Sequence, residues 1–426
     1  MTEEKRRYVL PASFDAYLSA EISTFLKNCL LYTTSIIGLS LAIANESRSF
    51  TIGFFVAFFF VIWQNTSAKL KWQHYALYGV SIVALLIILT TLFKVDSSSG
   101  RWLIYKIAIS IFKDNWMTGT GINGFQREFM HYQADYFIRG NYTSRELLLA
   151  DNTYFAFNEY FQFIIEAGLY GIVILMSAFS ILFYIAKAAL NIPSSKSLVV
   201  NTIAIIIAIV LAALFNYVFH LIVFQVLFLF CAFILIGLVT YKFYRRIFFW
   251  NAIVSALVLC SVIGAHYHYS LTGISAFRKL KEARQLGASG YRVHAEKIID
   301  SLPKVLHEDP EYLEIKSGLL LGRMELDNAK SLIYKLISKR PSFEAYLRLG
   351  MIYELSGNDN QAESAYKKAV FMVPNRFLSR YKLFKFYKRT NQTKNAIATG
   401  RIILSMPVKI PSPLVDQIKR SVMTEI

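Results

Sequence analysis

DNTYFAFNEYFQFIIEAGLYGIVILMSAF, residues 151–179, passes from a polar loop into an apolar run that continues to residue 186. A helix must carry roughly 20 consecutive apolar residues to cross the hydrocarbon core of a bilayer. The run from 160 to 186 satisfies that requirement. We therefore expect an integral membrane protein, one of whose spanning helices begins with polar turns.

Other apolar runs flank this one, and hydrophobic residues make up 55% of the 426-residue chain. A short run at 50–64 covers only about 22 Å at 1.5 Å per residue, so it is either extended by its flanks or partly re-entrant. The first 25 residues are charged and mixed and do not resemble a cleavable signal peptide. Counting the short run, the sequence predicts an all-α polytopic membrane bundle of about seven spans. The other runs are 26–45, 75–94, 160–186, 198–219, 221–241 and 247–267.

The net charge of +18 could indicate a nucleic-acid partner, but the positions of the basic residues favour another explanation. Many of them gather in short segments that fall on one side of the membrane when seven spans alternate. Short basic loops of membrane proteins are cytoplasmic, so we expect these segments to fix the orientation and expect no nucleic-acid partner. The residues are Lys5, Arg6, Arg7, Lys69, Lys71, Lys187, Lys196, Lys242, Arg245 and Arg246.

This orientation divides the chain into five parts. A cytoplasmic N-terminus, 1–25, precedes membrane helices 1–3 at 26–94. A large outer loop occupies 95–157, membrane helices 4–7 occupy 158–270, and a soluble outer domain occupies 271–426. The three cysteines all lie in apolar runs, and their spacing fits no metal or disulfide framework. We expect no metal site and no cofactor.

The soluble segment contains a helical repeat pattern. Small residues at 350 and 362 would let paired helices approach, and tyrosine rings would fill the space between them. We expect an α-solenoid of tetratricopeptide repeats with a concave face for a protein partner; the alternative is an unrelated helical bundle. The pattern consists of Tyr346-x2-Leu349-Gly350-x2-Tyr353, Ala362-x3-Tyr366 and the prolines Pro310, Pro341, Pro374 and Pro407.

The outer loop begins with an amphipathic segment. Ile104, Ile107, Ala108 and Ile111 share one helical face, which predicts a helix that lies along the outer membrane interface. The glycines at 119, 121 and 124 resemble a nucleotide-binding pattern only superficially, because no strand precedes them. We expect them to form a turn.

The helix that starts near residue 158 carries a polar stripe. Asn158, Gln162 and Glu166 are spaced by four residues, and Glu159 lies beside them. Ionisable groups at membrane depth are costly, by about 2.5–3.5 kcal/mol even on lenient scales, and they are retained where they face protein, water or a ligand. The alternative is an ordinary first turn in which Asn158 caps the helix and Glu159 suits its dipole. That alternative accounts poorly for Glu166.

Two arginines are expected on the same outer side. Arg48 lies at the outer end of two membrane segments, and Arg101 opens the amphipathic helix. A guanidinium can form paired hydrogen bonds to phosphate oxygens and stays charged in poor solvent. The two arginines beside the stripe would suit a substrate with a lipid tail and a pyrophosphate head, although either one could simply reach the lipid headgroups.

In these motifs the chain resembles the O-antigen ligase and polymerase family of bacterial membrane glycosyltransferases, in the version common in Bacteroidota-type bacteria. The resemblance covers about residues 40 to 190, and tetratricopeptide tails are common in such proteins. It rests on Ser47-Arg48, Ser99-Gly100-Arg101, Gly119-x-Gly121-x2-Gly124-Phe125, Tyr132-Gln133-Ala134-x-Tyr136-Phe137, Asn158-Glu159-Tyr160-x-Gln162 and Glu166-x-Gly168-x2-Gly171.

The resemblance implies the transfer of a glycan from undecaprenyl pyrophosphate to a saccharide or lipid acceptor at the periplasmic face of the inner membrane. Arg48 and Arg101 would neutralise the leaving group, and Glu159 would be the base. Residues expected to bind the substrate are Asn158, Gln162, Glu166, Gln133, His131 and Asp151.

The chain departs from the family pattern in two places. Many ligases carry a histidine immediately before the asparagine of this motif, and this chain has Phe157. His131 and Asp151 therefore remain alternative bases beside Glu159. Family members also have further spans before Ser47-Arg48, so the chain would be an N-terminally incomplete or split member.

Two other classes of function fit parts of the sequence. The chain could be a non-catalytic membrane anchor that presents its repeats as a scaffold for envelope polysaccharide assembly. It could also be a transporter, for which the polar residues Asn216, His220 and Gln225 near an outer turn give weak support.

Overall fold

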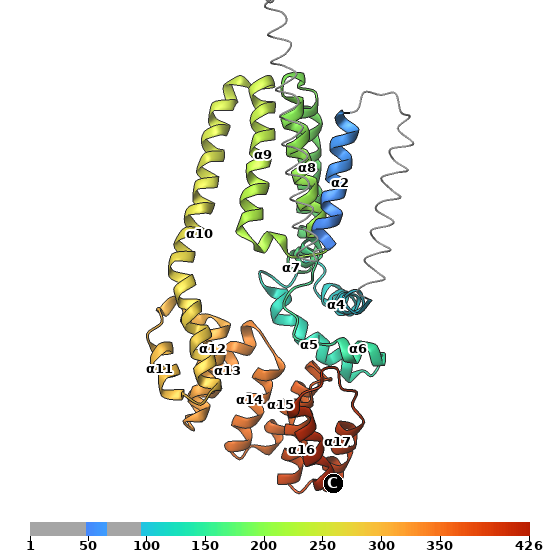
Figure 1. Cartoon of the computed structure of the whole chain (residues 1–426), viewed down its shortest axis with the longest axis vertical. Coiled ribbons are helices and arrows are strands. Elements are labelled where there is room, and N and C mark those ends of the chain that lie inside the picture. Colours follow the sequence, from blue (N-terminus) through green and yellow to red (C-terminus); the bar gives the residue numbers. More distant parts are fainter. Residues whose placement is uncertain (1–47, 66–94) are drawn as a thin grey trace, which may run out of the picture. The chain divides into compact units, whose positions relative to one another are not determined.

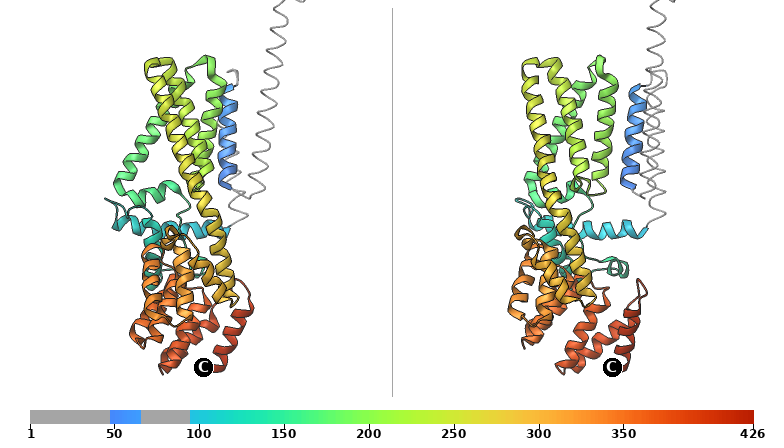
Figure 2. Two further views of the ribbon diagram at one scale, coloured as in Figure 1. Left: turned by 90° about the vertical axis from the view of Figure 1, so that its left-hand side faces the viewer. Right: turned by 60° about the vertical axis from the view of Figure 1, so that its left-hand side comes forward.

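The computed structural model describes residues 48–65 and 95–426, and every regular element in these two ranges is a helix (Figures 1 and 2). The expected N-terminal segment 1–25 and the apolar runs at 26–45 and 75–94 lie outside the described residues. The chain divides into two compact units. Of the described residues, 48–65 and 190–212 belong to the first unit, and 95–189 and 213–426 belong to the second.

Four helices in the described ranges are long and apolar enough to cross a membrane. They are α7 (Glu159–Leu190), α8 (Lys196–Ala213), α9 (Ile222–Phe243) and the segment Ile247–Tyr267 of α10 (Arg245–Ala288). They correspond to four of the predicted runs, and together they make the chain a multi-pass membrane protein. The count of seven spans stays a prediction.

The first unit contains a helix pair. The short apolar run forms α2 (Arg48–Asn65), whose 18 residues are about 27 Å long at 1.5 Å per residue. Ala57 and Val61 of α2 pack against Val200 and Ala204 of α8. Gly53 lets the two backbones approach closely, because a Cβ at this position would lie 2.6 Å from the carbonyl oxygen of Ala208.

In the second unit, the segment that the sequence predicts to be an outer loop folds into three helices: α4 (Val95–Asp114), α5 (Gly124–Ile138) and α6 (Ser144–Leu149). Leu103, Ile107 and Ile111 of α4 are buried in a core that includes Phe125 and Phe129 of α5. The apolar face of the amphipathic segment therefore packs on protein. Trp102, on another face of α4, is 68% exposed.

Helix α7 is broken at Gly168, which has φ 61° and ψ −142°. The break frees the carbonyls of Ile165 and Glu166, which accept hydrogen bonds of 3.0 and 2.9 Å from the backbone N–H groups of Thr120 and Gly121. A Cβ at Gly119, which has φ 71°, would lie 2.2 Å from the Glu166 carbonyl oxygen. The glycines after α4 thus form a turn, as expected, and the turn supplies the hydrogen bonds that the broken helix has lost.

Helices α9 and α10 form an antiparallel hairpin that is visible in Figures 1 and 2. Helix α10 has 44 residues and extends well beyond its apolar segment. Its C-terminal part packs against α11 (Arg292–Asp300) and α12 (Pro310–Gly322). The predicted boundary between membrane and soluble domains, at residues 270 and 271, therefore lies inside one continuous helix.

The C-terminal helices pack as consecutive pairs, α12 with α13, α14 with α15 and α16 with α17. The first helix of each pair begins at residue 310, 343 or 377, that is, 33 and 34 residues apart. A Cβ at Gly350 would lie 2.7 Å from the Tyr366 ring, so glycine permits the close contact between α14 and α15. The tetratricopeptide assignment stays a prediction. The remaining helices are α13 (Leu326–Lys339), α14 (Phe343–Leu355), α15 (Asp359–Met372), α16 (Phe377–Arg389), α17 (Thr393–Ser405) and α18 (Pro413–Glu425).

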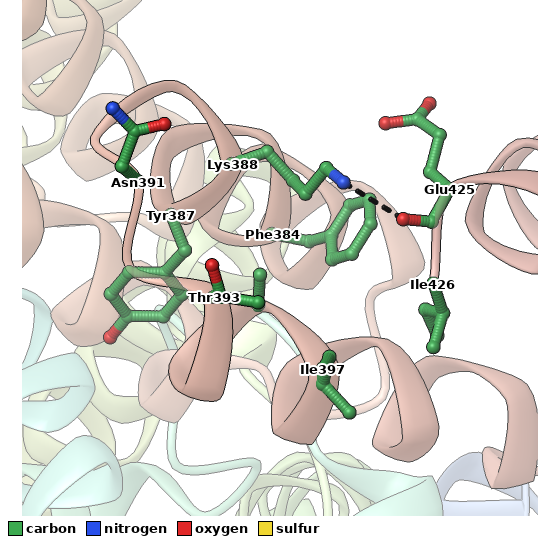
Figure 3. Close-up of a pocket in the computed structure, with 9 residues that line it drawn as sticks. Phe384, Tyr387, Lys388, Asn391, Thr393, Ile397, Glu425 and Ile426 are labelled. Atoms are coloured by element: carbon green, nitrogen blue, oxygen red, sulfur yellow. Dashed lines mark hydrogen bonds between the residues drawn. The ribbon is translucent and has the colours of Figure 1, made fainter.

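A small pocket lies where α16, α17 and α18 meet (Figure 3). Phe384 and Lys388 of α16 and Ile397 of α17 line it, together with Glu425 and Ile426. The Lys388 ammonium donates a hydrogen bond of 2.9 Å to the backbone carbonyl of Glu425. The pocket therefore belongs to the packing of α18 on the last helix pair.

Candidate functional site

The start of α7 is held by α4. Phe157, with φ 53°, turns the chain just before Asn158, whose side-chain oxygen accepts a hydrogen bond of 2.9 Å from the Phe161 N–H. Asn158 is thus the helix cap that the simpler interpretation required. The Tyr105 hydroxyl lies 3.4 Å from the Phe157 carbonyl oxygen, and the Arg101 guanidinium carbon lies 5.5 Å from the centre of the Phe157 ring.

Glu159 faces the short 3-10 helix η2 (Val218–His220), which joins α8 to α9. Its Oε1 atom accepts a hydrogen bond of 2.9 Å from the Phe219 N–H and lies 3.2 Å from Nδ1 of His220. The Glu159 side chain is 13% exposed and the His220 side chain is 42% exposed. The hydrogen bond with Glu159 raises the pKa of His220, and Glu166 acts in the same direction, although partial burial opposes them.

Aromatic rings surround this pair. The Phe155 ring lies 4.8 Å from the His220 ring and stacks on Tyr217 at the same centroid distance. The Phe157 ring is 5.7 Å from Tyr217. We define these five residues, Phe155, Phe157, Glu159, Tyr217 and His220, as the aromatic–histidine cluster. The Arg101 guanidinium contacts this cluster at the Phe157 ring.

Gln162 and Glu166 face the glycine turn. The buried Gln162 side chain accepts a hydrogen bond of 3.1 Å from the Ala156 N–H and donates one of 3.3 Å to Glu166 Oε1. The same Glu166 oxygen accepts from the Phe125 N–H at 3.4 Å. The predicted stripe therefore divides: Glu159 contacts η2, whereas Gln162 and Glu166 connect the first turns of α7 to the outer loop.

Three other residues predicted to bind the substrate contact the C-terminal helices. The Gln133 amide donates to the backbone carbonyls of Met372 and, at 3.1 Å, Asp151. Asp151 forms an ion pair of 2.7 Å with Arg376. The His131 ring lies edge-on to Tyr346, with 6.0 Å between the ring centres. These contacts attach the predicted outer loop to α14, to the end of α15 and to Arg376, the N-cap residue of α16. A role of the three residues in substrate binding stays a prediction.

The same attachment involves residues that the sequence did not indicate. The Asn375 side chain donates hydrogen bonds of 2.8 and 2.7 Å to the carbonyls of Leu148 and Ala150 at the end of α6. Asn152 donates one of 2.8 Å to Glu344. These partners are up to 227 positions apart in the sequence, so no local pattern could have paired them.

His131 is expected to make the folded protein acid-sensitive. Burial lowers its pKa from 6.5 to about 4, with a smaller effect of Lys368 in the same direction, and its buried Nδ1 has no hydrogen-bond partner among residues 48–65 and 95–426. Because the unfolded chain binds this proton near pH 6.5 and the folded chain near pH 4, stability falls as the pH drops between these values. Melting temperatures between pH 7 and 4.5 should fall less steeply for His131→Gln than for the wild type. Equal slopes would show that His131 is not responsible.

Arg48 and a metal site were the other subjects of the site predictions. Arg48 is the first residue of α2, but its side chain lies outside the described residues, and its helix belongs to the other compact unit. The predicted convergence of Arg48 with Arg101 therefore stays a prediction. Among the described side chains, no three His, Cys, Asp or Glu residues gather as ligands for a metal ion.

Part of the chain matches a known protein family. No curated protein matches the chain. A protein-family model described as O-antigen ligase matches residues 33–176, about a third of the chain. That range includes α2, α4, α5, α6 and the polar start of α7. This multi-pass membrane protein therefore contains, at residues 33–176, a region similar to the O-antigen ligases.

Proposed function

We propose that the protein transfers a glycan from undecaprenyl pyrophosphate to the hydroxyl of a saccharide or lipid acceptor, at the periplasmic face of the inner membrane. The family match over residues 33–176 supports the class of reaction. The observation that carries the proposal is the position of Arg101, whose guanidinium lies beside Phe157 and the capped start of α7. The cation thus contacts Phe157, an aromatic residue of the aromatic–histidine cluster.

The chemistry requires such a cation. When the bond between the sugar and the pyrophosphate breaks, negative charge develops on the leaving oxygen. A guanidinium that is already in position stabilises this charge in the transition state without further reorganisation. Arg48 is the second proposed cation for the same group.

The proposed orientation follows the distribution of basic residues. Lys187 and Lys196 lie at the connection between α7 and α8, and Lys242 lies near the end of α9, so these ends would be cytoplasmic. The aromatic–histidine cluster, the outer loop and the C-terminal helices would then be periplasmic. Exposed Trp102 and Trp116, 68% and 49% accessible, suit the membrane–water interface. The C-terminal helix pairs would be tetratricopeptide repeats that bind a protein of the glycan assembly.

Deletion of the gene and complementation test the proposal. The deletion strain should lose a surface glycan and accumulate its lipid-linked precursor, because the donor is no longer consumed. The full chain, expressed from a plasmid, should reverse both changes. An unaltered glycan profile and an unaltered precursor pool in the deletion strain would contradict the proposed function.

A further inference from the structure

The contact between Glu159 and His220 fixes the tautomer of the imidazole. A carboxylate can only accept hydrogen bonds, so Nδ1, at 3.2 Å from Glu159 Oε1, must carry a proton. In the neutral imidazole the lone pair is then on Nε2. Among the described residues, no hydrogen-bond partner is found for Nε2, and the His220 side chain is 42% exposed. His220 therefore presents a proton acceptor at an accessible surface.

Glu159 is less well suited to take a proton itself. Its Oε1 atom already accepts from the Phe219 N–H at 2.9 Å and faces His220, and its side chain is 13% exposed. A base must lie within reach of the acceptor hydroxyl, and the His220 side chain is the more exposed of the two, 42% against 13%. In this arrangement His220 has the place of a base, and the Glu159 carboxylate holds the imidazole ring in one orientation.

We propose that His220 is the general base of the transfer reaction and that Glu159 is the residue that positions it; this inference rests on the proposed function. The acceptor oxygen forms a bond to the anomeric carbon of the donor sugar. The bond from that carbon to the pyrophosphate oxygen breaks, and its electron pair leaves with undecaprenyl pyrophosphate. The proton of the acceptor hydroxyl passes to Nε2 of His220 and then to solvent.

The aromatic–histidine cluster connects the proposed base to Arg101. The reaction needs a cation at the leaving group and a base at the acceptor hydroxyl, which are different positions around one sugar. The Arg101 guanidinium contacts the Phe157 ring, and that ring contacts Tyr217. The centres of the Tyr217 and His220 rings are 6.1 Å apart. A series of ring contacts therefore connects the cation to the imidazole, and aromatic side chains offer apolar surface to a bound saccharide.

The electrostatic surroundings make the base dependent on pH in a defined direction. The charged groups of α7 that act on His220 are Glu159 and Glu166, and both raise its pKa above 6.5. From α9, the uncharged Gln225 supports η2 by donating a hydrogen bond to the Phe219 carbonyl. Since only neutral imidazole can accept a proton, activity should rise with pH through the raised pKa and then level off.

Three variants of the full chain test the proposal in cytoplasmic-membrane vesicles whose own lipid-linked glycan carries ³²P in its pyrophosphate. His220→Ala should slow release of labelled undecaprenyl pyrophosphate by about 10²–10⁴-fold, the usual contribution of a general base, with little change in KM for the lipid-linked donor. Added imidazole should restore part of the rate. Glu159→Gln keeps an acceptor for the Phe219 N–H but removes the negative charge that raises the pKa of His220. The acidic limb of its pH–activity profile, where activity rises with pH, should therefore move to lower pH. Gln225→Ala loosens the same turn and should leave the acidic limb in place.

A matched control and the contrary outcomes complete the test. His294→Ala removes an exposed histidine of α11 and should retain wild-type activity. Full activity of His220→Ala, or an unshifted acidic limb in Glu159→Gln, would overturn the assignment of the base. If Arg101→Ala is inactive in the same vesicles, the transfer function stands although the base is wrong. If His220→Ala does not accumulate in the membrane, the pH profile of Glu159→Gln decides the question.

Discussion

Arg101→Ala is expected to reduce glycan transfer by about 10²–10³-fold, the usual cost of removing one group that stabilises transition-state charge. The guanidinium is held over the Phe157 ring at 5.5 Å, next to the capped start of α7. Its removal takes away a fixed cation at the proposed position of the leaving pyrophosphate. The measurement is the surface-glycan profile of the complemented deletion strain, together with the amount of the variant in the membrane.

Two further arginine variants make this result specific. Arg101→Lys keeps the charge but loses the planar fork of donors that matches phosphate oxygens, so it should retain partial activity. Arg139→Ala removes an exposed arginine at the end of α5 and should behave as the wild type. Normal glycan in the Arg101→Ala strain, at normal protein level, would favour the non-catalytic scaffold over the transferase.

Gly119→Ala is expected to prevent the outer loop from packing on α7. The residue has φ 71°, which costs alanine about 1–2 kcal/mol, and the added Cβ would lie 2.2 Å from the Glu166 carbonyl oxygen. The turn would have to move away and give up the hydrogen bonds from Thr120 and Gly121 to the broken helix. We expect destabilisation of more than about 3 kcal/mol and little folded protein in the membrane.

Gly140→Ala is the matched control for this prediction. Gly140 has a similar φ of 79°, but a Cβ there would meet nothing within 4 Å. The Gly140→Ala variant therefore has the conformational cost of a positive φ but no steric clash. The melting temperature of the solubilised full chain should fall much more for Gly119→Ala than for Gly140→Ala. Equal decreases in melting temperature would mean that the close approach of Gly119 to Glu166 contributes little to stability.

The sequence predicted the elements that depend on local composition. The apolar runs from 160 onward correspond to α7, α8, α9 and the first part of α10. The polar start of α7 was also visible, because Asn158, Glu159, Gln162 and Glu166 interrupt an otherwise apolar pattern. Four-residue spacing alone could not show that these side chains divide between two partners.

Features that depend on distant segments were not predictable. The break at Gly168 is stabilised by residues 116–121, which arrive from before α5. The end of the last apolar run gave a domain boundary at residue 270, yet α10 continues to Ala288, because no proline interrupts it and its charged residues are compatible with a helix. On α4, the buried face includes Leu103, which lies outside the predicted apolar face.

The most important omission was His220. The sequence marked it only as a polar residue near an outer turn, with weak support for a transporter. Its partner Glu159 lies 61 positions earlier, and only the folding of η2 against α7 brings the two together. Likewise, Gln133, His131 and Asp151 were grouped with the substrate site by resemblance, whereas the C-terminal helices supply their contacts in the fold.

The central claim is that Arg101 holds the pyrophosphate of an isoprenoid-linked donor beside the aromatic–histidine cluster. The most direct test is equilibrium binding of undecaprenyl pyrophosphate to the full chain in lipid nanodiscs, for the wild type, Arg101→Ala and Arg139→Ala. The account predicts a Kd at least about tenfold higher for Arg101→Ala, a loss of about 1.4 kcal/mol, and an unchanged Kd for Arg139→Ala. Equal affinity of the wild type and Arg101→Ala would contradict it.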